Sequence, residues 1–430
     1  MRTRKLLLVG LLALCLTSSP LQLFAQQTRQ EKIEPVCSIP GLVAFWDFVQ
    51  REPAGERRFL ALGPTGATPA YPLDVTNYVF DYWGEGRQAG YSDFSEMNRG
   101  PFGNAVQIKP ETDATFRPCF IIPRSRLHDT ALDIKGDDQS VTVVVWAIRE
   151  SGNHALAGIW HEGTDLKQDE TQGIERVERG QRQYALFAGL SKPGTACGHA
   201  SENGAGSFLN KYALHKCNSL AAAPAIPSDA PAETLNQSWQ CFAMTLNHET
   251  DQLTGWLNGE AGERWLENPK SNGLFASAYQ AYQQGYWHQL PGLQEGEDPK
   301  FPAHQYYHPP EDQLIKTVIE EETLEQKTAL QFYPYTRVRV TYGKNVAGDW
   351  ETRQRELVAL SINPWWYPHG IYRPKDDGTG GPFTIGRVIH SARSVGFTGW
   401  IGGVAVFDRA LSEDELKILS GLRQTVVDAP

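Results

Sequence analysis

The last fifty residues of the chain constrain its fold more than any other segment. Residues 383–387 predict one strand and residues 397–407 predict a second. Glycines at 399, 402 and 403 in the second segment predict a tight turn or a β-bulge. Ser412 followed by Glu415 is a capping box, and leucines at 411, 416 and 419 form one apolar stripe. The chain therefore closes with strands followed by a short amphipathic helix.

Further strand-like segments precede this end of the chain, at 41–48, 100–108, 141–148, 239–246 and 253–259. In this order the segments resemble the strands of the LamG-like, concanavalin A-like jelly roll of secreted proteins. The resemblance implies an all-β jelly-roll sandwich of two antiparallel sheets, with long loop insertions and a short C-terminal helix. Partial alternation of apolar residues along these segments predicts which side chains lie between the sheets. The expected core residues are Trp46, Phe48, Val143, Val145, Phe242, Met244, Val404 and Val406.

The N-terminus has the pattern of an export signal. Basic residues within the first five positions precede the apolar run 6–16, and a small residue, Ala25, marks the cleavage point. This run is too short to span a bilayer. Cys15 raises the alternative of a lipid anchor, but Leu14 stands where a lipobox needs a small residue. We therefore expect a signal peptide at 1–25, a linker at 26–36 and a secreted or periplasmic product.

The mature chain is acidic. Removal of residues 1–25 takes away three of the 40 basic residues and none of the 50 acidic ones, which leaves a net charge of −13. This charge disfavours nucleic acid and anionic membrane surfaces, because both are bound by clustered Lys and Arg. The sequence therefore predicts neither a nucleic-acid partner nor membrane insertion.

Five cysteines remain after removal of the signal peptide, and export permits disulfides. Cys197 and Cys217 bracket a loop rich in Gly, Asn and Ser, so we expect them to pair. Cys37 and Cys119 are a second candidate pair. Cys241 alternates with apolar neighbours on an expected core strand, which favours a buried free thiol.

The mature chain is long for a single sandwich, yet long insertions can account for its length. We expect one domain at 37–425, with insertions at about 51–99, 191–234 and 261–379. Residues 338–342 alternate as a strand does and 357–362 are a matching strand, so the third insertion carries its own β-structure. Residues 317–328 are expected to form a short acidic helix.

Aromatic and histidine residues gather in the third insertion, and these are the residues that stack on sugar rings and bond to their hydroxyl groups. Proline on both sides of 365–367 stiffens one such loop and lowers the entropy lost on binding. The alternative is that these side chains pack the loops against the sheet. The candidate ligand-binding residues are Trp365, Trp366, Tyr367, His369, Tyr306 and Tyr307.

No catalytic motif stands out. The chain lacks the Glu-x-Asp-x-Glu strand of jelly-roll glucanases, which supplies two carboxylates to one bond. A polysaccharide lyase would need a Tyr or His base and an Arg near a uronate carboxylate. The candidates for these roles are His199, Tyr184, His161 and Arg339.

A cation site is a further expectation. Asp376 and Asp377 in a Gly-rich turn offer oxygen ligands to calcium, with a plain turn as the alternative. Some LamG-like modules hold calcium beside an Asp near the first strand, a position that Asp47 fills here. The sequence as a whole predicts an exported protein that binds a polysaccharide or other glycan. The alternatives are a polysaccharide lyase or glycoside hydrolase on the same scaffold, and a surface protein that binds another protein.

Overall fold

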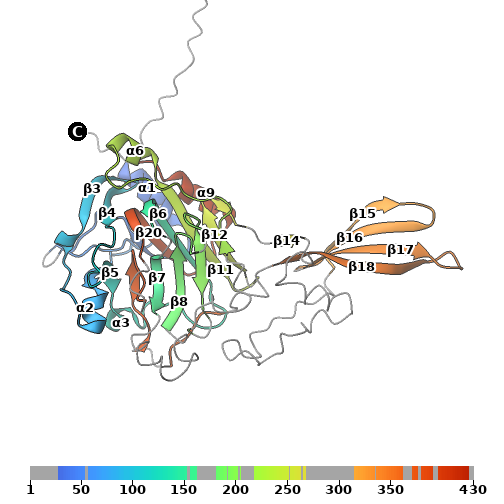
Figure 1. The fold of residues 1–430 in the computed structure, drawn as a ribbon, viewed down its shortest axis with the longest axis horizontal. Helices are drawn as coiled ribbons and strands as arrows, with labels where there is room; N and C mark the ends of the chain where they lie inside the picture. The colour runs from blue at the N-terminus through green and yellow to red at the C-terminus, as the bar shows by residue number, and fades with distance from the viewer. Residues whose placement is uncertain are drawn as a thin grey trace, which may run out of the picture.

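The computed structural model is an all-β sandwich with a third sheet beside it (Figure 1). It describes residues 28–53, 57–152, 155–161, 181–190, 192–201, 204, 217–250, 252–262, 265–267, 314–334, 336–361, 370–375, 379–390 and 396–425. Within these ranges every strand pair in the named sheets is antiparallel. The expected fold class is confirmed.

Two sheets form the sandwich. The first sheet runs in the order β13 (Glu260–Ala261), β12 (Gln252–Leu257), β11 (Gln240–Asn247), β6 (Val141–Ser151), β20 (Thr398–Phe407), β4 (Gly103–Ile108) and β3 (Ser95–Gly100), and β1 (Leu42–Trp46) also pairs with β20. The second sheet runs in the order β10 (Cys217–Asn218), β9 (Cys197–Ala200), β8 (Gln181–Phe187), β7 (Ala155–His161), β19 (Phe383–Ile385), β5 (Pro118–Ile122) and β2 (Asp74–Asn77).

The third sheet and the helices complete the described structure. The third sheet runs in the order β14 (Trp265–Glu267), β18 (Trp350–Ser361), β17 (Thr336–Lys344), β16 (Gln326–Phe332) and β15 (Lys316–Glu322). The helices are α1 (Arg29–Ser38), α2 (Tyr78–Trp83), α3 (Arg124–Leu127), α6 (Ala232–Gln237) and α9 (Glu413–Gly421), with a 3-10 turn, η1, at Tyr91–Asp93.

The main core lies between the first two sheets. All eight core residues expected from the sequence belong to it and are buried. The rings of Trp46 on the first sheet and Phe383 on the second stack with their centroids 5.3 Å apart. Burial of such large apolar surfaces is the main favourable contribution to folding.

The glycines of β20 allow close packing on both sides of the first sheet. The pairing of β20 with β6 shifts register between Ile401 and Gly403, so the expected β-bulge is present. A Cβ atom on Gly402 would stand 2.9 Å from ring carbons of Trp239, and one on Gly403 would stand 2.8 Å from the ring of Phe102. Only glycine fits at these two positions.

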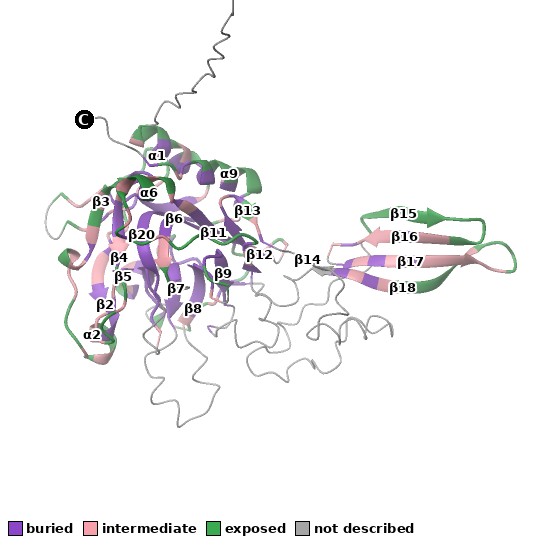
Figure 2. Cartoon of the chain, turned by 45° about the horizontal axis from the view of Figure 1, so that its top comes forward, coloured by how far each residue is buried: buried purple, intermediate pink, exposed green. Residues whose placement is uncertain are grey.

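Helices α1 and α9 cover the outer face of the first sheet, and the residues with which they contact the sheet are buried. Figure 2 shows both helices beside this sheet. The expected capping box of α9 is confirmed, because Ser412 and Glu415 each accept a backbone N–H of the other. Helix α1 has a capping box as well, and its Ile33 and Val36 are buried. The prediction of a linker at 26–36 is therefore wrong over most of this segment, because Arg29–Ser38 form a packed helix.

The third sheet confirms the β-structure expected in the third insertion, with Val338 opposite Leu357. The acidic helix expected at 317–328 is wrong, because this segment forms β15, a turn and the start of β16. The turn is closed by the Thr323 N–H, which donates to the Gln326 carbonyl at 2.8 Å. The β-branched run Thr317, Val318 and Ile319 favours a strand, and pairing with β16 overrides the helix preference of the glutamates.

The other two expected insertions are part of the sandwich. Residues 51–99 contribute β2 to the second sheet and most of β3 to the first. Residues 191–234 contribute β9 and β10. Short or polar strands of this kind lack the apolar run by which strands are recognised in a sequence.

All five cysteines among the described residues are free and buried, so the expected Cys197–Cys217 disulfide is absent. The two thiols lie in hydrogen-bond contact on β9 and β10 without an S–S bond. Cys217 Sγ also contacts the Gly198 carbonyl, and Cys197 Sγ lies 3.3 Å from His199 Nε2. Cys37 and Cys119 are not paired either, and Cys241 is the buried free thiol that its pattern predicts.

Candidate functional site

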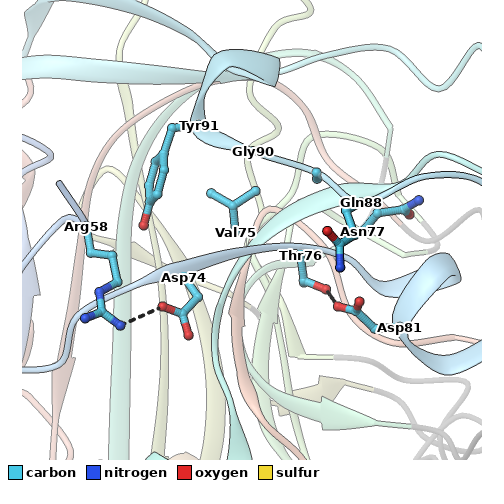
Figure 3. Close-up of a pocket in the computed structure, with 10 residues that line it drawn as sticks. Arg58, Asp74, Val75, Thr76, Asn77, Asp81, Gln88, Gly90 and Tyr91 are labelled. Atoms are coloured by element: carbon cyan, nitrogen blue, oxygen red, sulfur yellow. Dashed lines mark hydrogen bonds and ion pairs between the residues drawn. The ribbon is translucent and has the colours of Figure 1, made fainter. Parts of the chain in front are cut away.

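A polar groove runs along β2, the edge strand of the second sheet, and encloses about 640 Å³ (Figure 3). One wall is β2 itself, and the other is the segment 88–91 that leads into η1. Arg58 and Asp81 lie at the two ends of the groove in Figure 3. All of its lining residues come from positions 58–91, a compact part of the chain.

Asn77 fixes the shape of the groove. Its side-chain N–H groups donate to the carbonyls of Arg87 and Thr115, each at 2.8 Å. Its side-chain oxygen accepts the N–H of Val79, which caps α2, and the N–H of Arg117. One buried amide thus ties β2, α2 and two loops together, so Asn77 supports the site and is not free to bind a ligand.

Tyr91 forms the opposite wall. Its hydroxyl donates to the Leu73 carbonyl, and its ring meets the ring of Phe59 edge-on at a centroid distance of 6.1 Å. These contacts hold the ring in place while it remains half-buried. Val75 lies beside the ring in the middle of the groove (Figure 3). Tyr91 and Val75 therefore give the groove a small, rigid apolar surface.

Charged groups of both signs flank this apolar surface. The guanidinium of Arg58 donates to Glu52 at 2.8 Å and to Asp74 at 3.2 Å, and Arg126 also pairs with Asp74. These hydrogen bonds raise the pKa of Arg58, which is charged at any physiological pH. At the other end, Asp81 accepts a hydrogen bond from the Thr76 hydroxyl.

Part of this polar surface remains available to a ligand. Asp81 and Gln88 are exposed, and the Gln88 amide has no hydrogen-bond partner among the described residues. The groove thus offers carboxylate acceptors, an amide and a guanidinium around one tyrosine ring. Arg58 and Arg126 neutralise Glu52 and Asp74, whereas Asp81 makes no ion pair among the described residues. The groove therefore suits a neutral polar ligand better than an anionic one.

The candidate catalytic histidines lie elsewhere, on the second sheet. His161 ends β7, and its ring contacts the Tyr82 ring at a centroid distance of 5.2 Å. His199 on β9 packs edge-on against Trp160 and Phe187, at 5.5 and 5.1 Å. Both histidines are buried. Their aromatic packing is the environment of a structural histidine.

The structure does not bring the other two catalytic candidates to these histidines. Tyr184 is completely buried in the core, where its hydroxyl donates to the Leu132 carbonyl at 2.8 Å and burial raises its pKa well above the ordinary value. Arg339 lies on the third sheet and pairs with Glu320 and Glu356. No acid–base pair is assembled from these four residues.

The expected ligand and metal residues have different outcomes. Trp365, Trp366, Tyr367, His369, Tyr306, Tyr307, Asp376 and Asp377 lie outside the described residues. Asp47 is buried and accepts hydrogen bonds from Arg29 and from the backbone N–H groups of Val49 and Gln50. These donors occupy the carboxylate, and no group of three or more metal-ligating side chains occurs among the described residues.

Sequence patterns do not predict the β2 groove, because its residues fall within the insertion expected at about 51–99. A local signal does exist: residues 71–83 contain five aromatic side chains alongside Asp74 and Asp81. Only the pairing of β2 with β5 shows that this segment is a sheet edge.

No family model and no curated protein matches this chain. Among solved structures, domain 4 of an extracellular GH43 arabinanase from Geobacillus stearothermophilus, in complex with arabinotriose, matches with a TM-score of 0.34 and 9% identity over 88% of this chain and 98% of that one. A sialidase CBM40 domain from Ruminococcus gnavus matches with a TM-score of 0.30 and 10% identity, over 74% and 96%. Likenesses this distant say nothing of the ligand of this chain.

Proposed function

We propose that this chain is an exported carbohydrate-binding protein and that its glycan site is the groove along β2. One observation carries the proposal: a fixed tyrosine ring stands among acceptors and donors spaced along a groove of about 640 Å³. Sites for small ligands typically enclose about 300–1,000 Å³. The groove therefore has room for a short stretch of glycan.

The chemistry of the lining fits a sugar. The C–H faces of a sugar ring stack on an aromatic ring such as that of Tyr91, and its hydroxyls both donate and accept hydrogen bonds. Asp81 accepts, Gln88 does both, and Arg58 donates. A lipid or other apolar ligand would leave these polar groups without partners, which costs free energy.

The position of the site also favours binding. The groove rests on a sheet edge braced by Asn77, so little order has to be gained when a ligand enters. No helix among the described residues is long and apolar enough to cross a bilayer. Export through residues 1–25 would place the site where extracellular glycans occur.

A glycan array followed by calorimetry on the best ligand tests the proposal. Asp81→Asn and Gln88→Ala should each weaken binding about three- to tenfold, the effect of one lost hydrogen bond of about 0.5–1.5 kcal/mol. Asp349→Asn and Gln354→Ala are matched controls, because both residues are exposed on or beside strands of the third sheet. The proposal fails if the controls weaken binding as much, or if neither groove variant changes it.

The same experiment separates binding from catalysis. Product analysis of the bound glycan should find it intact. New reducing ends or unsaturated products would instead support a hydrolase or a lyase on this scaffold. Failure to retain any glycan would favour a protein-binding role.

A further inference from the structure

The two ends of the β2 groove differ in charge. At one end the guanidinium of Arg58 is paired with carboxylates, and Arg126 adds a second positive charge there, so this end is close to neutral. At the other end Asp81 is exposed and makes no ion pair among the described residues. One of its oxygens accepts the Thr76 hydroxyl, a neutral donor. The groove therefore keeps one negative charge without a counterion, at the end formed by α2.

The Asp81 carboxylate can accept further hydrogen bonds. A carboxylate has about four acceptor positions, and the Thr76 hydroxyl occupies one of them. Gln88, which is also exposed, lies at the same end of the groove in Figure 3 and offers an amide oxygen there. An ammonium group donates three hydrogen bonds and accepts none, whereas a hydroxyl has a single hydrogen to donate. A group of acceptors of this kind therefore matches an ammonium better than a hydroxyl.

The charge of the whole chain acts in the same direction. The formal net charge is −10 at pH 7, and a field of this sign attracts cations. A hydrogen bond between two charged groups is roughly twice as strong as one between neutral groups. A glycan that carries an ammonium at the Asp81 end thus gains more than a neutral glycan of the same length.

We propose that the glycan bound in this groove carries free amino groups, as an unacetylated hexosamine does, and that Asp81 recognises them. This assignment rests on the proposed function and names the class of glycan. A glycan chain that lies along the groove stacks one ring on Tyr91 and places an ammonium against Asp81 and Gln88. An N-acetyl group in place of the ammonium has no charge and a single N–H, so the acetylated form of the same glycan binds less tightly.

Calorimetry with two oligosaccharides of equal length tests this assignment. The probes are a glucosamine tetramer and its fully N-acetylated counterpart, at about pH 6, where a free amine is protonated. The amine form should bind about three- to tenfold more tightly, the gain of a charge-assisted hydrogen bond over a neutral one. Asp81→Asn should bring the two forms to equal affinity, and Asp81→Glu should keep the preference. Asp349→Asn makes the same change of charge on an exposed turn of the third sheet and should leave the preference unchanged.

Equal affinity of the two forms overturns the assignment, as does a preference that Asp81→Asn leaves intact. Trilysine is the probe for charge alone, and an affinity equal to that of the glucosamine tetramer would overturn recognition of a sugar. If Asp81→Asn does not fold, as judged by circular dichroism, Asp81→Ser makes the same test.

The outcome also separates this assignment from the proposed function. Binding of neutral glycans without a preference for free amines would overturn the assignment and leave carbohydrate binding in the groove standing. A chain that retains no glycan, with or without amines, would overturn both.

Discussion

At the scale of single residues, Lys32 is a charged group buried between α1 and the segment after α9. It is only 2% exposed, and its ammonium donates to the carbonyls of Leu422 and Gln424 near the C-terminus. Burial lowers its pKa from 10.5 to about 8. The residue therefore ties α1 to the segment that follows α9 while its charged form is disfavoured.

This shift makes stability depend on pH. Between about pH 8 and 10.5 the unfolded chain keeps the Lys32 proton more often than the folded chain does, so the free energy of unfolding rises with pH across this window. The free energy of unfolding of the natural chain minus that of Lys32→Met, measured with denaturant, should be ~1–3 kcal/mol larger at the top of this pH window than at its bottom. A difference independent of pH would contradict the shifted pKa.

Burial and neighbouring groups also shift the pKa values of the cysteines, so their thiols differ in reactivity. Burial raises the pKa of Cys119 and of Cys241 to about 12 and that of Cys37 to about 11, so these thiols are protonated at neutral pH. Burial also acts on Cys197, but the hydrogen bond from Cys217 and the charge of His199 outweigh it and hold the pKa of Cys197 well below its usual value. Thiolate character and access together decide alkylation.

Alkylation therefore gives a direct check on these thiols. Iodoacetamide without reductant should modify Cys37, Cys119 and Cys241 slowly in the folded chain, and all five in denaturant. Mass mapping of a non-reduced digest should find the peptides of Cys197 and Cys217 separate. A linked pair of these peptides would contradict the free state of Cys197 and Cys217.

At the scale of elements, β20 depends on its glycines. Gly402→Ala would place a methyl group 2.4 Å from Pro101 Cδ and 2.9 Å from the Trp239 ring. Forcing these groups apart should cost about 1–3 kcal/mol of stability. Gly421→Ala at the end of α9 is the control, since nothing lies within 4 Å of its added Cβ. Thermal unfolding that ranks the two variants equally would refute this packing.

At the scale of the whole molecule, α1 belongs to the folded unit. It packs on the first sheet beside α9, and its Arg29 pairs with Asp47, which is completely buried. A chain that starts at residue 40 loses this helix and leaves the Asp47 charge without that partner. It should be less stable than a chain that starts at residue 27 by at least about 3 kcal/mol, the cost of breaking a buried ion pair. Equal denaturation midpoints would mean that 26–36 acts as the linker first expected.

The sequence by itself determined the elements whose signals are local. Apolar strands such as β6, β11 and β20, the capping box at Ser412 and the eight core residues all follow from short-range patterns. Their side chains are buried wherever the strands end up, so the pattern is the same in any sandwich.

Tertiary structure decided the rest. β2 has no apolar run of its own, and in β15 a short β-branched run stands beside three glutamates. Both segments are therefore recognised as strands only from the neighbouring strand that pairs with each of them. The β2 groove needs Asn77 to join segments 38 residues apart, and the separation of Arg339 from His199 follows from strand order. Contacts between residues far apart in sequence depend on how the sheets assemble, and that arrangement is not encoded in any one segment.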